Sequence, residues 1–292
     1  MITSFIIIST WMCAAVVSTL PLLLSPANIA IQILFIALVP VLFMLSFAST
    51  LGLISWRFQK GIIPGRFPRD TKHPIYFCRR IYGTCWTQIF YFKPLYAAVL
   101  AIPAFKKMTL KLFGMKGNLN FTVYPDTWIR DLPLLNLGSG AYLANRATIG
   151  TNVVLSDGSI LVDGITIGDN ALIGHLSIIG AGSKIGEKAE IGLRATLGIR
   201  VKIEKGADVK PQCSINHAAV IGEGASVGAM SFIGLRCVIG PGIKVPPGSN
   251  IPNGKILRSQ SDCDKYFSME TADLEKHRLR ILQNLQTTEK RE

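Results

Sequence analysis

Two histidines lie in the same short pattern and are the side chains best suited to acid–base chemistry. His175 stands third in the stretch Ile-Gly-His-Leu-Ser-Ile-Ile-Gly, and His217 stands third in Ile-Asn-His-Ala-Ala-Val-Ile-Gly. Both stretches share one template, with an aliphatic residue two places before the His, a small residue two places after it, and a closing aliphatic–Gly pair. A neutral imidazole is suited to accept a proton near neutral pH. The pattern therefore predicts a general base at one of the two histidines.

Both histidines belong to a long run in which an aliphatic residue returns at every sixth position. From Leu137 to Leu257 each sixth residue is Leu, Ile or Val, and the residue four places later is usually small. A period of six is neither a helical period nor a simple strand alternation. It fits a chain that coils round a triangular prism, with one short strand and one turn per six residues. The sequence predicts about seven coils of eighteen residues without an inserted loop, stacked about 4.8 Å apart.

This run resembles the hexapeptide-repeat family, the left-handed parallel β-helix of bacterial acyltransferases. The template around His175 and His217 looks like the segment that holds the general-base His in the acyltransferases of lipid A and sugar N-acyl synthesis. The resemblance implies an acyl thioester donor, on coenzyme A or on the phosphopantetheine of a carrier protein. It also implies a hydroxyl or amine acceptor, and a homotrimer with its clefts between subunits.

The repeat period also predicts which residues stack on the histidines. If each coil has eighteen residues, Asp157 lies directly below His175, whereas His217 has only aliphatic stack neighbours. A carboxylate one strand spacing away would orient the imidazole and stabilise its charged form. We therefore expect His175 to be the base and Asp157 its partner. His217 as the base, or neither histidine, are the alternatives.

Other polar residues at the repeat turns are candidates for substrate binding: Asn145, Asn152, Asp163, Asp169 and Asn216. By the same count Asp157, Asp163 and Asp169 occupy three successive sides of one coil, and Asn145 stacks under Asp163. They would form a polar belt that binds the acceptor, or would be turn residues that bond their own backbone. The two histidines are seven repeats apart, which places them on adjacent sides of the prism, about 11 Å apart in height.

The amino-terminal segment, residues 1–56, is predicted to be a transmembrane helical hairpin. Residues 1–55 carry no charged side chain, and two apolar runs, 1–24 and 29–55, flank a turn at Ser25–Asn28. Each run is long enough to span about 30 Å of hydrocarbon. A cleaved signal peptide is the alternative, but the segment lacks a basic start and a second apolar run follows at once.

Residues 57–131 alternate basic and aromatic side chains and are predicted to form helices at the membrane interface, with 94–113 as a stretch that could enter the bilayer. The positive-inside rule places the repeat domain and both termini in the cytoplasm, at a bacterial inner membrane. The net charge of +13 then reflects contact with anionic membrane lipids. Nucleic acid binding would also explain basic residues mixed with aromatic ones, but two adjacent membrane spans make it the less favoured alternative.

A second, looser resemblance lies in the same region. The residues Arg79-Arg80, Trp86 and Leu112-Phe113-Gly114 ahead of a hexapeptide run are similar to the membrane-embedded carboxy-terminal part of ε-poly-lysine synthetase. That family tends to carry a His early in its first coils, where this sequence has Asn152. The resemblance implies a different activity, an amide-forming ligase that works with the loaded carrier of a partner synthetase.

The cysteines and the carboxy-terminal residues complete the expected domain organisation and function. The six Cys lack metal-ligand spacing and two of them occupy small-residue repeat positions, which predicts neither a disulfide framework nor a metal site. Residues 132–257 form the predicted β-helix domain, and 258–292 a helical tail that covers the open end of the stack. We expect a membrane-anchored acyltransferase. The amide-forming ligase and a non-catalytic membrane scaffold are the alternatives.

Overall fold

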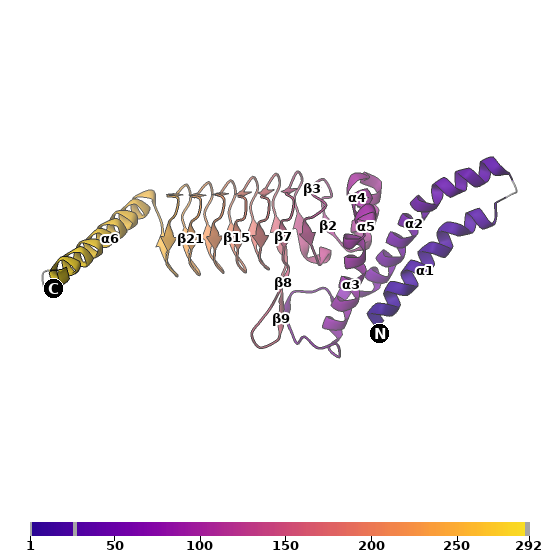
Figure 1. Ribbon diagram of the computed structural model, residues 1–292, viewed down its shortest axis with the longest axis horizontal. Coiled ribbons are helices and arrows are strands. Elements are labelled where there is room, and N and C mark those ends of the chain that lie inside the picture. Colours follow the sequence, from indigo (N-terminus) through magenta and orange to yellow (C-terminus); the bar gives the residue numbers. More distant parts are fainter. Residues whose placement is uncertain (1, 26–27, 290–292) are drawn as a thin grey trace.

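The computed structural model describes residues 2–25 and 28–289, without the side chains of 270–274, 277 and 282–289. Figure 1 shows a long β-solenoid with a helical part at one end and a single helix at the other. The two central residues of the predicted Ser25–Asn28 turn lie outside the described residues, as does the side chain of His277.

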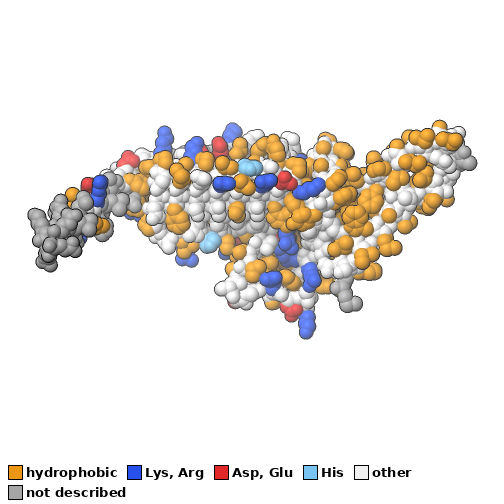
Figure 2. Space-filling view, in the orientation of Figure 1, with side chains coloured by type: hydrophobic (Ala, Val, Ile, Leu, Met, Phe, Trp, Pro, Cys, Tyr) orange, Lys and Arg blue, Asp and Glu red, His pale blue; other side chains and the backbone are white. Residues whose placement is uncertain are grey.

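An antiparallel pair of apolar helices forms the far end of the helical part. These are α1 (Ile2–Leu23) and α2 (Ile29–Phe58), which pack along each other. The Asn28 side chain begins α2 by accepting hydrogen bonds from the backbone N–H groups of Ala30 and Ile31. Both helices are long and apolar enough to cross a membrane. Figure 2 shows hydrophobic side chains along the whole visible surface of the pair.

Three shorter helices connect this pair to the solenoid. A turn η1 (Gln59–Gly61) and strand β1 (Gly65–Phe67) lead to α3 (Pro74–Tyr91), α4 (Lys93–Ala101) and α5 (Pro103–Leu112), each with Pro in its first turn. The helix α3 packs against both α1 and α2. Its buried Trp86 donates a hydrogen bond of 2.7 Å to the carbonyl of Ile129 in the first coil. The helix is therefore a structural link between the apolar pair and the solenoid.

The β-helix predicted from the sequence is confirmed, with three parallel sheets of eight, seven and seven strands. Sheet 1 contains β2 (Lys116–Gly117), β5 (Leu135–Leu137), β10 (Ile165–Ile167), β13 (Lys184–Ile185), β16 (Lys202–Ile203), β19 (Val220–Ile221), β22 (Val238–Ile239) and β25 (Ile256–Leu257). Sheet 2 contains β3 (Thr122–Val123), β6 (Tyr142–Leu143), β11 (Leu172–Ile173), β14 (Glu190–Ile191), β17 (Asp208–Val209), β20 (Ser226–Val227) and β23 (Lys244–Val245). Sheet 3 contains β4 (Trp128–Ile129), β7 (Thr148–Ile149), β12 (Ile178–Ile179), β15 (Thr196–Leu197), β18 (Ser214–Ile215), β21 (Phe232–Ile233) and β24 (Asn250–Ile251). The chain visits sheets 1, 2 and 3 in turn, so the coil has edges between sheets 2 and 3 (the 2–3 edge) and between sheets 3 and 1 (the 3–1 edge).

The solenoid begins one coil before the aliphatic repeat does. Strands β2, β3 and β4 form a first coil, and a short helical turn η2 (Leu132–Leu134) follows it. In sheet 1, Gly117 pairs with Leu137, twenty residues later rather than eighteen. The two extra residues break the step of six, and for this reason the repeat count cannot find this coil.

An excursion interrupts the solenoid after β7, so the prediction of an uninterrupted run was wrong. Strands β8 (Asn152–Val154) and β9 (Ile160–Val162) form an antiparallel hairpin, and β1 pairs with β9 on its outer side. Leu137 pairs with Ile167, thirty residues later, whereas Ile167 pairs with Ile185, eighteen residues later. The excursion thus adds twelve residues, which is two repeat units. A strand alternation of two is compatible with a step of six, so the hairpin leaves no trace in the repeat.

The carboxy-terminal helix α6 (Gln260–Glu289) covers the last coil with its first turns and then extends away (Figure 1). Cys263 is fully buried there, and the Tyr266 hydroxyl donates a hydrogen bond of 3.2 Å to the carbonyl of Asn250. The Gln260 side chain accepts a hydrogen bond from the backbone of Lys244. These contacts give the last strands the partners that a further coil would otherwise supply.

A buried ion pair ties α3 to the solenoid. The Arg79 side chain, 3% exposed, lies 2.7 Å from the fully buried carboxylate of Asp131. The hydroxyl of Thr151, at the base of the hairpin, donates to the same carboxylate oxygen at 2.7 Å. One carboxylate therefore joins a helix, the end of the first coil and the hairpin.

Replacing Arg79 by Met should strongly destabilise the protein, because it removes the cation that is hydrogen-bonded to the buried Asp131 carboxylate and leaves only Arg130, at 3.9 Å. We expect a loss of about 3–5 kcal/mol in the free energy of unfolding, seen as a large drop in the thermal midpoint in detergent. Arg80→Met is the matched control, since Arg80 is the next residue of α3, is exposed and forms no ion pair with the described residues. Equal losses in the two variants would contradict a special role for the pair.

Candidate functional site

His175 lies on the 2–3 edge, in the turn between β11 and β12. Because Leu172 pairs with Tyr142 and Ile173 with Leu143, the residue that stacks under His175 is Asn145. The prediction that Asp157 stacks there was wrong, because the count of eighteen crosses the twelve-residue excursion. The predicted stacking of Asn145 under Asp163 fails for the same reason.

Asp157 lies at the tip of the hairpin and stabilises it. Its carboxylate accepts hydrogen bonds from the Ser159 hydroxyl at 2.6 Å and from the Ser159 backbone at 3.0 Å, and it forms an ion pair with Arg66 in the middle of β1. The Ser159 hydrogen bonds and then Arg66 lower the pKa of Asp157 to about 2. This carboxylate holds the hairpin tip to the β1 segment.

The His175 imidazole is half-buried and makes no hydrogen bond with the described residues. One strand spacing below it, the side-chain carbonyl oxygen of Asn145 is buried and also has no partner. A carbonyl oxygen in such a place can accept a hydrogen bond from one imidazole nitrogen and leave the lone pair of the other nitrogen free. The corrected register thus gives His175 an amide neighbour in place of the predicted carboxylate.

His217 lies on the 3–1 edge, and its ring is held by the backbone of the coil below. Its Nδ1 accepts a hydrogen bond of 2.8 Å from the backbone N–H of Ile199. A neutral imidazole that accepts at Nδ1 carries its proton on Nε2. The outward nitrogen is then a donor, and His217 has no lone pair for a substrate proton. This favours His175 over His217 as a base.

The other predicted polar residues do not form one belt. Asp163 forms an ion pair of 2.9 Å with Arg200, and Asp169 accepts a hydrogen bond of 2.7 Å from the backbone of Ser139. The Asn216 side chain accepts one of 2.7 Å from the backbone of His217. Asp157 and Asp163 belong to the excursion and Asp169 to the following turn, so the three aspartates do not occupy three sides of one coil. Asn152 is the exception, because it lines a cavity.

The two histidines stand at the two borders of sheet 3, which is the uncharged face of the prism. Sheet 1 presents Lys184 and Lys202 outward, and sheet 2 presents Glu190, Asp208 and Lys244. The outward residues of sheet 3 from the second coil on are Thr148, Ile178, Thr196, Ser214, Phe232 and Asn250. Ile178 is 48% exposed and Phe232 is 40% exposed. A face without charge and with exposed apolar side chains is typical of a subunit interface.

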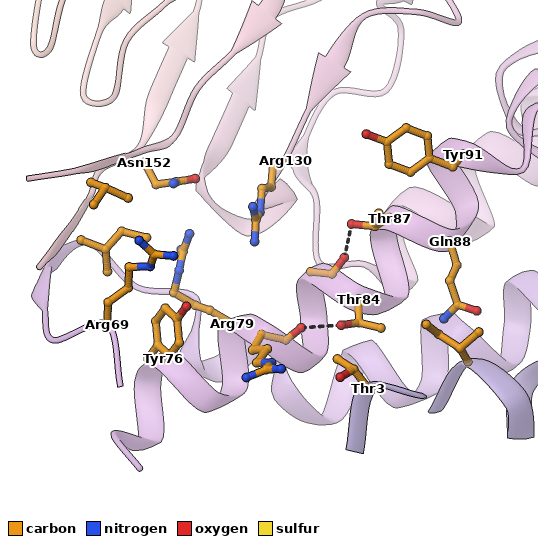
Figure 3. A pocket seen from close by; sticks show the side chains of 15 residues that line it. Thr3, Arg69, Tyr76, Arg79, Thr84, Thr87, Gln88, Tyr91, Arg130 and Asn152 are labelled. Atoms are coloured by element: carbon orange, nitrogen blue, oxygen red, sulfur yellow. Dashed lines mark hydrogen bonds between the residues drawn. The ribbon is translucent and has the colours of Figure 1, made fainter. Parts of the chain in front are cut away.

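A basic cavity of about 640 Å³ lies where α1, α3 and the hairpin meet. Figure 3 shows Arg69, Arg79 and Arg130 reaching toward one region below Asn152. Gly83 on α3 permits this arrangement, because a Cβ there would stand 2.8 Å from Nη2 of Arg130. The cavity lining within the described chain is Thr3, Ile7, Arg69, Tyr76, Arg79, Arg80, Gly83, Thr84, Thr87, Gln88, Tyr91, Arg130, Asn152, Val154 and Ile160.

No family model and no curated protein matches the chain, but solved structures do. The UDP-N-acetylglucosamine O-acyltransferase of Moraxella catarrhalis is 14% identical with a TM-score of 0.37, over 47% of this chain and 65% of its own. A hexapeptide-repeat acetyltransferase of Vibrio cholerae, complexed with acetyl coenzyme A, is 17% identical with a TM-score of 0.32, over 52% and 78%. The acetyltransferase domain of PglB from Neisseria gonorrhoeae is 17% identical with a TM-score of 0.23, over 53% and 61%. All three are acyltransferases. At these identities the likeness is one of fold, and this chain spans less than two thirds of the Moraxella and Neisseria chains.

The cavity arginines were not predicted as a site. The alternation of basic and aromatic residues in 57–131 predicts only a segment at the membrane interface, and only the fold shows which of the basic residues converge. The described residues contain no group of three His, Cys, Asp or Glu side chains that could hold a metal ion.

The tautomer of His217 is a direct test of the difference between the two histidines. In long-range ¹H–¹⁵N spectra of protein labelled at His, we expect His217 to carry its proton on Nε2, because the Ile199 N–H occupies Nδ1. Signals are assigned with single His→Gln variants. A neutral His217 with its proton on Nδ1 would contradict this assignment.

Proposed function

We propose that the chain is a membrane-anchored acyltransferase that moves an acyl group from a thioester to a hydroxyl or amine. The donor is an acyl group on coenzyme A or on the phosphopantetheine of a carrier protein. The observation that carries the proposal is the His175 imidazole, which is free of hydrogen bonds within the described chain and stacks over the unpartnered Asn145 carbonyl.

In the proposed reaction His175 acts as the general base. Asn145 accepts a hydrogen bond from one ring nitrogen, and the other nitrogen takes the proton of the acceptor hydroxyl or amine as that group attacks the thioester carbonyl. The tetrahedral intermediate collapses, the carbon–sulfur bond breaks, and the imidazolium returns the proton to the leaving thiolate. The product is an ester or amide and a free thiol.

The active unit is proposed to be a homotrimer with sheet 3 at its centre. If three copies place sheet 3 toward a threefold axis, the 2–3 edge of each copy meets the 3–1 edge of the next. His175 of one copy and His217 of its neighbour then line the same cleft, a little more than two coils apart, at a height difference of about 11 Å. His217, with its Nε2–H, would donate a hydrogen bond to another part of the donor or acceptor.

The helices α1 and α2 are proposed to anchor the trimer in the membrane. Hydrophobic side chains line the face of the pair that is visible in Figure 2, and Arg57, near the end of α2, is the first charged residue of the chain. The positive-inside rule then keeps the solenoid on the cytoplasmic side, where acyl thioesters are available. An anchor is useful to this enzyme if its acceptor is itself linked to lipid.

A charge placed on sheet 3 should break the trimer. We expect Ser214→Glu to shift the protein from trimer to monomer in mass photometry and to lower acyl transfer, because three carboxylates would face one another near the axis. Ser226→Glu, at the equivalent outward position of sheet 2 and equally half-buried, should leave the trimer intact. A trimer that survives Ser214→Glu would rule out sheet 3 as its interface.

Replacing His175 by Ala should lower turnover by roughly two to four powers of ten without loss of folding or assembly, because the side chain lies outside the core. The assay is thiol release from acyl coenzyme A in the presence of a membrane extract. Asn145→Ala should lower turnover less. His217→Ala should mainly raise the Michaelis constant.

Four outcomes would contradict the proposal in different ways. Loss of turnover in His217→Ala with near-normal His175→Ala would assign the base to the other histidine. Full turnover in both variants would mean that neither histidine is the base, and no turnover with any coenzyme A or carrier-protein thioester would favour a scaffold. Activity only with the loaded carrier of a partner synthetase would favour an amide-forming ligase.

A further inference from the structure

Two side chains that line the basic cavity, Arg79 and Gln88, carry buried hydrogen-bond donors without a partner in the described part of the chain. Arg79 is 2% exposed and uses one terminal nitrogen for Asp131, whereas its other terminal nitrogen, Nη1, is buried without a partner. The amide nitrogen of Gln88 is also buried and has no hydrogen-bond partner in the described chain, whereas the Nε of Arg130 lies 3.9 Å from Oδ1 of Asp131. Leaving such donors unpaired is costly, and a bound acceptor would satisfy them.

The cavity is also strongly positive. Four arginines line it, and its lining contains no Asp or Glu within the described chain. The carboxylate of Asp131, which is not part of the lining, neutralises one of these four positive charges. It lies 2.7 Å from Arg79 and 3.9 Å from Arg130. Arg69 and Arg80 form no ion pair with the described residues. The ligand that fits is therefore an anion, and several converging guanidinium groups are the arrangement that suits phosphate.

One side of the cavity is apolar and continues onto the surface of α1. Ile7, Val154 and Ile160 belong to the lining. On the same face of α1, Ile7 is 39% exposed, and Trp11, one turn further along the helix, is 41% exposed. A soluble anion would gain nothing from this surface, whereas an acyl or isoprenoid chain would be buried by it.

We propose that the cavity binds the phosphate group of a membrane amphiphile, with Arg69, Arg79 and Arg130 around the phosphate and the apolar chain along α1. The inference rests on the membrane-anchoring part of the proposed function and not on acyl transfer, so a binding experiment tests it independently of turnover.

The experiment measures binding of dioctanoyl phosphatidic acid to the full-length protein in dodecyl maltoside, by native mass spectrometry and by thermal shift. We expect saturable binding, weakened roughly ten- to a hundredfold in the double variant Arg69→Gln/Arg130→Gln, because two charged hydrogen-bond donors are lost. Dioctanoylglycerol, which lacks the phosphate, should not bind. Inorganic phosphate should compete only weakly, because it lacks the chain.

Two control variants separate a built site from general attraction of charge. Arg258→Gln, at the opposite end of the solenoid, should not change binding although it removes a positive charge. Gly83→Ala keeps every charge but displaces the Arg130 guanidinium, and it should weaken binding severalfold. The thermal midpoint of each variant without ligand shows that it is folded.

Several results would overturn the proposal. Equal weakening in Arg258→Gln and in the double variant would mean nonspecific attraction. Competition by inorganic phosphate as strong as that by phosphatidic acid would mean a site for free phosphate. Tight competition by desulfo-coenzyme A would make the cavity part of the donor site.

Discussion

The buried carboxylate of Asp131 is the point on which the arrangement of the whole molecule depends. It receives the Arg79 guanidinium from α3 and the Thr151 hydroxyl from the base of the hairpin, both at 2.7 Å. It follows the first coil directly, at a residue with left-handed backbone angles (φ 53°) where the chain turns into η2. A buried charge is costly unless it is fully paired. The Asp131 carboxylate therefore has its partners only when α3, the end of the first coil and the base of the hairpin are all in place. The same contact uses one terminal nitrogen of Arg79, a residue of the cavity lining, and leaves the other without a partner in the described chain.

The stack of coils could be predicted because every coil requires the same residue types at the same positions. An aliphatic side chain every sixth residue fills the prism, and every coil from Ile165 onward keeps the spacing of eighteen. The first coil and the hairpin could not be predicted, for opposite reasons. The first coil breaks the period by two residues, whereas the hairpin preserves it by containing two whole units. A periodic pattern thus shows which residues of a strand point inward. It does not show which strands pair with each other.

The candidate site shows the same division between local and distant information. The local template around His175 and His217 identified the two residues, and the seven-repeat count placed them on adjacent edges. The stacking partner of His175 depends on the number of residues between neighbouring coils, and the hairpin adds twelve. Without knowledge of the hairpin, the count of eighteen selects Asp157, whereas the structure places Asn145 there. The cavity depended on still more distant contacts, since Arg69, Arg79 and Arg130 come from three segments. Only Asn152, selected from the first coils, was predicted as a binding residue and lines this cavity.

In the proposed trimer, the hairpin of one subunit would lie near the His175 edge of the next and so link the two proposed sites. It leaves the solenoid on the 3–1 edge, between β7 and β10, at the end that carries the apolar helices. In a trimer with sheet 3 at the centre, this edge meets the 2–3 edge of the neighbour. There His175 stands only one coil above the level of the hairpin base, a height difference of about 5 Å. An amphiphile whose phosphate lies in the cavity of one subunit would therefore extend the remainder of its head group toward the general base of the next. In the proposed trimer, the apolar helices, the basic cavity and the histidine of the neighbouring prism would then serve one reaction, the proposed acylation of a lipid-linked acceptor at the membrane surface.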